Sequence, residues 1–119
     1  MIKNLCFALV ALAFLSVNAF AIPVSSNANY SAVTVGTSSA SILSPFQANI
    51  FLDVYNDSAT ATVCCAFGAA ATISGTACAA GELSLPAGWH RSWENNYIPA
   101  DQLFCIASAA STPVTLGYK

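Results

Sequence analysis

The chain has 119 residues, of which 56% are hydrophobic and only 7% are charged, and its formal net charge is −2. A chain of this length holds one hydrophobic core rather than two, so we expect a single domain. So few basic side chains leave nothing to hold a phosphate backbone, which excludes nucleic acid as a partner. The surface must instead consist mainly of Ser, Thr, Asn, Ala and Gly, as in proteins that pack beside copies of themselves.

Residues 1–21 are predicted to be a signal peptide. Lys3 gives a positive start, an apolar run extends from Leu5 to Val17, and Ala19 and Ala21 are small residues at the alternate positions that a signal peptidase accepts. Removing 21 of 119 residues leaves 98, with two basic and five acidic side chains and a net charge of −3. An uncleaved anchor is the alternative, because the apolar character continues weakly to Val24.

Export is therefore the expected fate of the chain. We expect the mature protein to be extracellular, on a cell surface or on a virion surface, with the periplasm as a further location. It should meet a membrane only through the signal segment before cleavage. Residues 22–29 are rich in Pro, Ser and Asn and are predicted to be a flexible lead-in to a domain that spans residues 30–119.

Short strands follow one another along this domain. Tyr30 to Gly36 alternates as a first strand, and Thr37 to Ser41 is a small polar turn before Ile42 and Leu43. The clearest pattern runs from Ile50 to Gly68, where two alternating stretches flank the polar residues Asn-Asp-Ser at 56–58. Asn and Asp suit a turn because their side chains bond nearby backbone and tolerate left-handed dihedrals. We therefore predict a hairpin with one apolar face.

The second half of the chain adds more strands. Glu82 to Leu85, Leu103 to Ala109 and Pro113 to Tyr118 are predicted strands, and Ala69 to Gly75 is predicted to be a loop because glycines flank it. No stretch after the signal predicts a helix of ten or more residues. Six to seven short strands between turn residues predict an all-β fold, a single small antiparallel β-sandwich that is Ig-like or jelly-roll-like.

Four cysteines remain after cleavage, and an even number in an exported chain favours disulfides. Adjacent residues of a strand point to opposite faces, so Cys64 and Cys65 should find separate partners. Cys65 lies on the apolar face and pairs best with Cys105 in an apolar stretch, which leaves Cys64 for Cys78. A Cys64–Cys105 bridge stays open as an alternative. A zinc site is disfavoured because no Cys-x-x-Cys pair is present and His90 is the single histidine.

The order of turns and strands resembles that of small β-sandwich proteins associated with the virions of tailed bacteriophages. The features that carry the resemblance, over about Ala32 to Gly117, are a strand ending in Asn56, a strand ending in Phe67-Gly68, the loop Ala69 to Thr72, Gly75, a Gly81 turn, Ile98-Pro99 and Leu103 to Ser108. The resemblance implies a non-enzymatic surface or decoration protein in a repetitive arrangement. Its partners would be copies of itself or other surface and coat proteins.

The sequence predicts no catalytic residues, no metal ligands and no cofactor. His90, Ser92 and Asp101 lie near one another, but a strand places His90 and Ser92 side by side rather than aimed at each other, and no Gly-x-Ser-x-Gly elbow is present. Asp53 and Asp57 lack the alternating acidic ligands of a calcium loop. We therefore do not expect an enzyme.

The stretch from Trp89 to Tyr97 is the strongest candidate for recognition. It combines large aromatic side chains with directed hydrogen-bonding groups, a mixture found where proteins meet partners or sugars. The candidate ligand-binding residues are Trp89, Arg91, Trp93, Asn95 and Tyr97. The alternative is that one Trp fills the core and the other packs at a turn.

Two functions follow from these features. The first is an exported structural or decoration protein, phage-virion-like, that acts by surface contacts in many copies. The second is a secreted monomeric binding module that holds a glycan or another ligand on the stretch from Trp89 to Tyr97.

Overall fold

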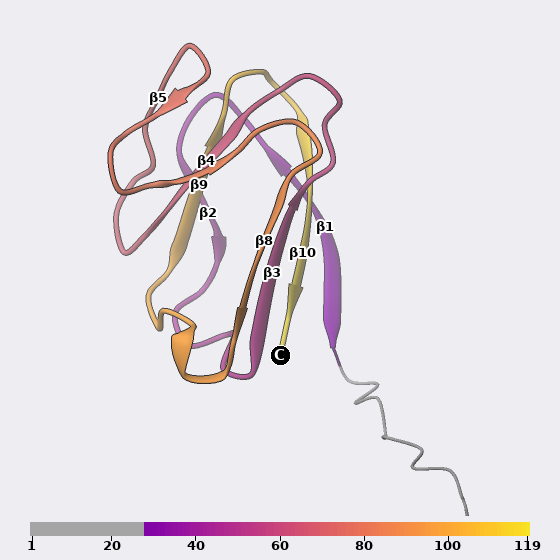
Figure 1. The fold of residues 1–119 in the computed structure, drawn as a ribbon, viewed down its shortest axis with the longest axis vertical. Helices are drawn as coiled ribbons and strands as arrows, with labels where there is room; N and C mark the ends of the chain where they lie inside the picture. The colour runs from indigo at the N-terminus through magenta and orange to yellow at the C-terminus, as the bar shows by residue number, and fades with distance from the viewer. Residues whose placement is uncertain (1–27) are drawn as a thin grey trace, which may run out of the picture.

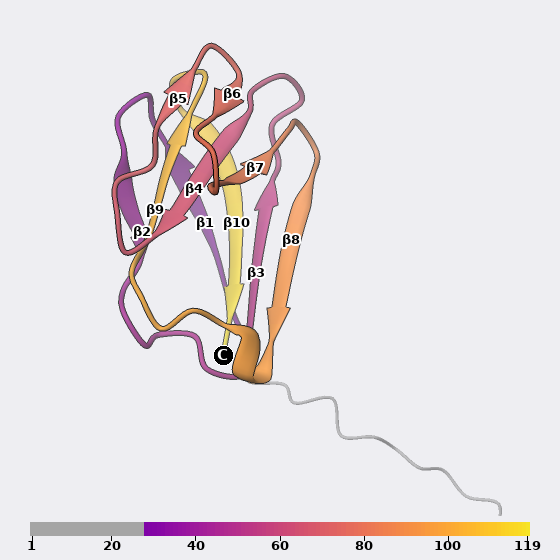
Figure 2. The same ribbon diagram turned by 60° about the vertical axis from the view of Figure 1, so that its left-hand side comes forward.

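The computed structural model describes residues 28–119, which form a sandwich of two antiparallel sheets (Figures 1 and 2). The predicted signal peptide lies outside the described residues, and the first strand begins at Asn29, one residue before the predicted start of the domain. The elements are β1 (Asn29–Val35), β2 (Ala40–Leu43), β3 (Phe51–Asn56), β4 (Val63–Phe67), β5 (Ile73–Ser74), β6 (Ala77–Cys78), β7 (Leu83–Leu85), β8 (His90–Glu94), the 3-10 turn η1 (Asn95–Tyr97), β9 (Leu103–Ala107) and β10 (Thr112–Tyr118).

The strand order identifies the topology. The first sheet has the order β1-β10-β3-β8, the second has the order β2-β9-β4-β7, and β5 and β6 form a separate two-stranded hairpin. Eight strands in these two orders make a jelly roll, which decides between the two sandwich types that the sequence left open. The predicted all-β antiparallel class is confirmed. Within residues 28–119, no helix has the length and apolar character that a membrane span needs.

The predicted number of strands was too low, because residues 28–119 form ten strands rather than six or seven. β5 and β6 have two residues each and lie in or next to the predicted Ala/Thr loop. Such short pairs show no alternation of apolar and polar residues, so periodicity cannot find them. They form because the chain turns at Gly75, which has a φ of 63° that other residues rarely adopt.

The predicted hairpin from Ile50 to Gly68 is wrong in its pairing. β3 pairs with β10 and β8 in the first sheet, whereas β4 pairs with β9 and β7 in the second. Each strand does present one apolar face, but the two faces meet across the sandwich instead of lying side by side. Alternation specifies which face a strand buries and does not specify its neighbour.

The hydrophobic core fills the space between the two sheets. In β3, β9 and β10 every second side chain is buried, and these inward side chains are apolar except Asn56 and Thr112 at strand ends. Removing this apolar surface from water is the main force that holds the sheets together. The large side chains buried completely include Leu52, Leu85, Leu103, Leu116, Val35, Val54, Val63 and Val114.

Two disulfides cross-link the second sheet, and both involve β4. Cys65 and Cys105 lie directly opposite each other on β4 and β9, and their bond belongs to the core. Cys64 points away from the core cluster and is bonded to Cys78 of β6, which holds the β5–β6 hairpin to β4. The disulfide-bonded fold is as expected, and the two pairs are those that the sequence favoured.

Candidate functional site

The five predicted ligand-binding residues lie on or beside β8, an edge strand of the first sheet. Trp89 comes directly before β8 and is 63% exposed, while Tyr97 lies in η1 after its end and is 84% exposed. A strand of five residues is about 17 Å long, so these two rings lie at opposite ends of β8. Arg91 and Trp93 occupy the middle of β8, and Asn95 begins η1. The structure therefore spreads the five residues along an edge instead of gathering them in one pocket.

Trp93 belongs to the margin of the core. Its ring is half-buried and meets the ring of Phe67 edge to face, with centroids 5.5 Å apart. The guanidinium carbon of Arg91 lies 6.0 Å from the centroid of the Trp93 ring, within reach of a cation–π interaction. The two side chains line a cavity of about 270 Å³ on the side of the sandwich where β8 faces β7. Trp93 thus has a packing role, whereas Trp89 is exposed.

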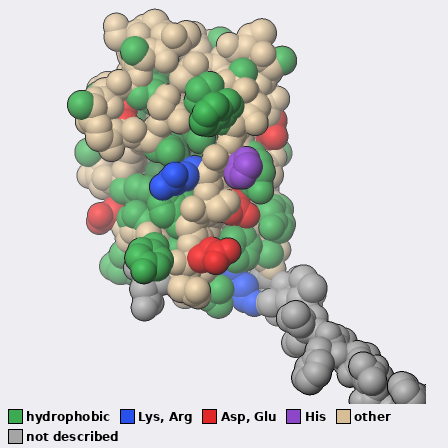
Figure 3. Space-filling model, viewed as in Figure 1, with side chains coloured by type: hydrophobic (Ala, Val, Ile, Leu, Met, Phe, Trp, Pro, Cys, Tyr) green, Lys and Arg blue, Asp and Glu red, His purple; other side chains and the backbone are tan. Residues whose placement is uncertain are grey.

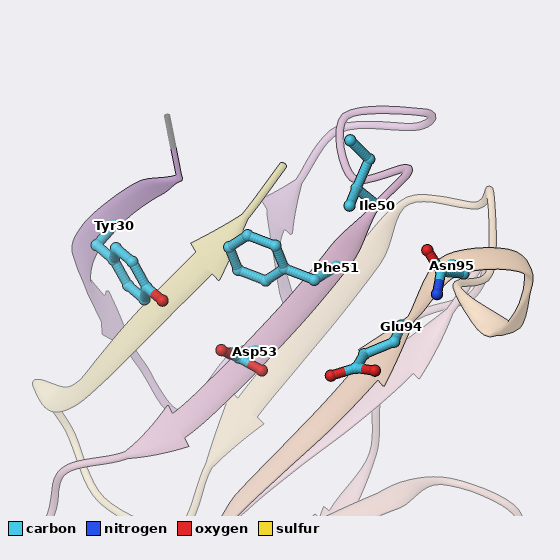
Figure 4. Close-up of a pocket in the computed structure, with 6 residues that line it drawn as sticks. All are labelled: Tyr30, Ile50, Phe51, Asp53, Glu94 and Asn95. Carbon is cyan, nitrogen blue, oxygen red and sulfur yellow. The ribbon is translucent and has the colours of Figure 1, made fainter. Parts of the chain in front are cut away.

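A wider groove lies on the outer face of the first sheet, and Figure 4 shows its walls. It has a volume of about 400 Å³ and draws its residues from β1, β3, β8 and the ends next to β3 and β8. The residues that line it are Tyr30, Ile50, Phe51, Asp53, Glu94 and Asn95. Of these, only Asn95 was predicted from the sequence to be a binding residue. The others come from three segments between Tyr30 and Glu94, and strand pairing brings these segments together.

Gly117 makes room for this groove. It lies on β10 between Tyr30 of β1 and Asp53 of β3 in the register of the sheet. A Cβ atom at this position would overlap the ring of Tyr30, which therefore lies over the glycine. The Tyr30 ring is also 6.2 Å from the ring of Phe51, measured between centroids. Two aromatic rings thus form one wall of the groove.

Two carboxylates, those of Asp53 and Glu94, face the same groove (Figure 4). Among residues 28–119, neither carboxylate has a hydrogen bond or an ion pair. Carboxylates accept hydrogen bonds, and aromatic faces attract cations or pack against apolar surfaces. The groove can therefore hold a small group that carries hydrogen-bond donors or a positive charge.

The groove offers little to a reaction. The ring of His90 is stacked on Tyr55, with centroids 4.9 Å apart, and it does not line the groove. In the register of β8 with β3, His90 lies opposite Tyr55 and Ser92 lies opposite Asp53. The two side chains therefore project from the same face of the sheet instead of toward each other. Within the described part of the chain, no three His, Cys, Asp or Glu side chains are grouped so that they could hold a metal ion.

Replacing Gly117 by Ala tests how the groove is built. The new methyl group must displace the Tyr30 ring, which is the outer end of an exposed side chain and can swing aside. We therefore expect a change in stability of about 1 kcal/mol or less, together with altered NMR shifts of the Tyr30 ring. Ala32→Gly, two positions along β1, is the control. Unchanged Tyr30 shifts in Gly117→Ala would contradict this geometry.

One end of the sandwich carries exposed apolar side chains. We refer to four of these side chains as the end surface: Tyr30, Phe46, Ile50 and Tyr97. They are 62%, 77%, 47% and 84% exposed, respectively. Backbone hydrogen bonds tie the segments together, from Phe46 N–H to Ala100 C=O at 2.9 Å and from Asn95 N–H to Ile50 C=O at 2.7 Å. Figure 1 shows the start of β1, the end of β10 and the turn after β8 at this end.

Phe46 is the least expected member of the end surface. Its φ is 57°, in the left-handed region that bulky side chains rarely adopt. Folding gains little from a ring that stays in water, and the backbone conformation itself costs free energy of order 1 kcal/mol. A strained backbone that displays an exposed aromatic ring is typical of a contact site.

The chain matches no protein-family model and no curated protein. Among solved structures it is similar to a chain described with Bacillus endospore appendages, which form a family of disulfide-linked pili. The sequence identity is 16%, the TM-score is 0.42, and the match covers 78% of this chain and 85% of that chain. At this level of similarity, the function of the present chain has to be argued from its own surfaces.

Proposed function

We propose that this protein is an exported, non-enzymatic structural subunit that acts through surface contacts with copies of itself in a repetitive assembly. The observation that carries the proposal is the end surface, where four large side chains are exposed at the same end of the sandwich and one of them has a strained backbone. Large apolar side chains that stay exposed at one end of a folded domain are typical of a site of interaction.

The scarcity of charge supports the same function. Only 7% of the residues are charged, whereas about a quarter is usual for a soluble domain. Charged side chains and a net charge far from zero keep proteins apart in solution. Figure 3 shows few charged side chains on the face seen in Figure 1, and hydrophobic and other uncharged groups cover most of it. Copies of this chain therefore meet little electrostatic repulsion.

Export is part of the proposal. The two disulfides support it, because such bonds persist in oxidising compartments and are rare in the cytosol of mesophiles. The predicted signal peptide supports it independently. A cell surface or a virion surface is the setting in which such a subunit would assemble, and the resemblance to virion-associated β-sandwich proteins favours a coat or decoration role.

The size of the secreted protein tests this function. Light scattering on the mature chain should detect particles much larger than one copy. In the double variant Phe46→Asn with Tyr97→Ser, these particles should fall to small species, because two exposed rings of the end surface are lost. Asn tolerates the left-handed backbone at position 46, so the variant should still fold.

Trp89→Ser is the control for this experiment, because it removes another exposed aromatic ring, 63% exposed, from the other end of β8. Its assembly should match that of the unmodified protein. A mature chain that stays monomeric at high concentration would overturn the proposed assembly.

A second candidate function is supported by the groove on the first sheet. The pair of rings and the two carboxylates without partners among the described residues would suit a binding module for a small ligand, such as a glycan or an organic cation. NMR titration with arginine amide and with methyl glycosides would test it. Binding that is lost in Asp53→Asn, but kept in Asp101→Asn, would favour this candidate, and no shift with either probe would reject it.

A further inference from the structure

Each four-stranded sheet has two edges, and three of the four edges are protected. Native proteins protect edges with charges, shortness or bulges, because an open edge pairs with other chains. β8 carries charged or titratable groups at His90, Arg91 and Glu94, and β7 has only three residues. β2 has four residues, and its register with β9 shifts between Ser41 and Leu43. None of these three edges offers a long, regular strand without charge.

β1 is the exception. It has seven residues, and its register with β10 is unbroken from Asn29 opposite Tyr118 to Val35 opposite Thr112. Its sequence contains no charged residue, no Pro and no Gly, and most of its side chains are exposed. Among the described residues no strand lies on its outer side, which Figure 1 places at the margin of the sandwich. The edge therefore presents a row of backbone N–H and C=O groups to another strand.

We infer that β1 pairs with β1 of a second copy, antiparallel, about a two-fold axis at Ala32. In this register all seven residues of β1 pair, Tyr30 lies opposite Thr34 of the second copy, and Ser31 lies opposite Val33. An aromatic residue opposite a β-branched one is a favourable pair, and no like charges meet because β1 has none. The first sheets of the two copies then become one sheet of eight strands.

A second β1 fits this edge better than the other edges of a second copy. Pairing with β8 would engage only five residues and bring charged side chains next to the uncharged strand. Pairing with β2 or β7 would engage four or three residues. The self-pair leaves no residue of β1 unmatched, so it satisfies the largest number of open backbone groups.

This inference rests on the proposed assembly, in which the dimer formed through β1 would be the repeating unit. Antiparallel strands run in opposite directions, so a dimer built on β1 carries its two end surfaces at opposite ends. A two-fold contact alone closes after two copies, whereas a second, different contact lets the dimers repeat. Self-paired β1 strands and the end surface would together extend the assembly.

Cysteine cross-linking tests the register. In Ala32→Cys the two new cysteines face each other across the axis with their Cα atoms about 4.5–5.5 Å apart, within the range of a disulfide. The main species on a non-reducing gel should be a covalent dimer. Thr34→Cys is the control, because it is exposed on the same face of β1 but would lie roughly 13 Å from its counterpart, four residues along the strand. It should stay uncross-linked.

Charge substitution at the same position provides the second measurement. Ala32→Lys should be monomeric in the Phe46→Asn, Tyr97→Ser background, because two ammonium groups would meet at the axis. An equimolar mixture with Ala32→Glu in that background should recover dimers. Failure of Ala32→Cys to cross-link while the unmodified chain still assembles would overturn the β1 inference alone. Efficient cross-linking in a protein that never exceeds a dimer would confirm it and overturn the repetitive assembly.

Discussion

Replacing Cys65 and Cys105 together by Ala should lower the free energy of unfolding by about 4 kcal/mol. The bond closes a loop with a sequence separation of 40 residues, so it removes much of the conformational entropy of the unfolded chain. Both sulfurs are also buried between the sheets, where the Ala side chains would pack less well. A domain of this size has a stability of only about 5–15 kcal/mol, and urea unfolding followed by fluorescence would measure the loss.

The second disulfide provides the comparison. The Cys64–Cys78 bond closes a sequence separation of only 14 residues and lies outside the core cluster, so the same chain-entropy argument gives about 3 kcal/mol for Cys64→Ala with Cys78→Ala. This variant should release the β5–β6 hairpin while the two large sheets remain, and hydrogen exchange should rise first in residues 73–78. If its loss of stability exceeded that of the Cys65 and Cys105 variant, the loop-length argument would be wrong.

The all-β class was predicted mainly from the alternation of apolar and polar residues along the sequence. β3 and β10 bury every second side chain, as the pattern predicted, and the turn residues between the segments indicated short antiparallel strands. β9 was predicted as a buried strand and also buries every second side chain. The same alternation placed Cys65 on the apolar face and Cys64 on the opposite face of the strand, and the structure has the two bonds that follow from that placement. These features depend on local periodicity, which a single sequence does contain.

Strand neighbours depend on long-range pairing and could not be predicted in this way. β3 and β4 follow each other in the chain and look like a hairpin, but β10 lies between β1 and β3, and β9 lies between β2 and β4. Inserting a strand from the end of the chain satisfies the backbone of both neighbours and is typical of Greek-key folds. No local signal in the residues from Ile50 to Gly68 indicates such an insertion.

The candidate surfaces were missed for a related reason. The predicted site was one continuous stretch, Trp89 to Tyr97, whereas the groove combines residues of β1, β3 and β8, and the end surface combines β1 with two loops. A partial signal was present in β3, where Phe51 and Asp53 occupy the outward positions of a strand whose inward positions are Leu52 and Val54. A large ring on an outward position indicates a functional surface only after the register is known.

The connection between β3 and β4 depends on one buried polar residue, Asn56, which is only 1% exposed. Its side-chain amide donates hydrogen bonds to Ala61 C=O at 2.8 Å and to Leu85 C=O at 2.9 Å, and its side-chain oxygen accepts one from Ser58 N–H at 3.1 Å. The first and third bonds shape the segment that crosses between the sheets. The second joins it to the end of β7, so one side chain links both sheets.

Asn56→Ala should therefore lower the free energy of unfolding by about 2–4 kcal/mol, because two buried carbonyls and one amide lose their partner. Asn56→Asp should be worse, since a carboxylate cannot donate to the two carbonyl oxygens and would leave a buried charge unpaired. Asn49→Ala, an exposed Asn just before β3, should change stability by less than about 0.5 kcal/mol. Denaturant unfolding of the three variants would rank them. An Asn56→Asp variant as stable as the unmodified protein would contradict this role of the side chain. The connection between β3 and β4 would then be held by its apolar neighbours, and the turn at 56–58 would need no side-chain hydrogen bond to keep the two strands in separate sheets.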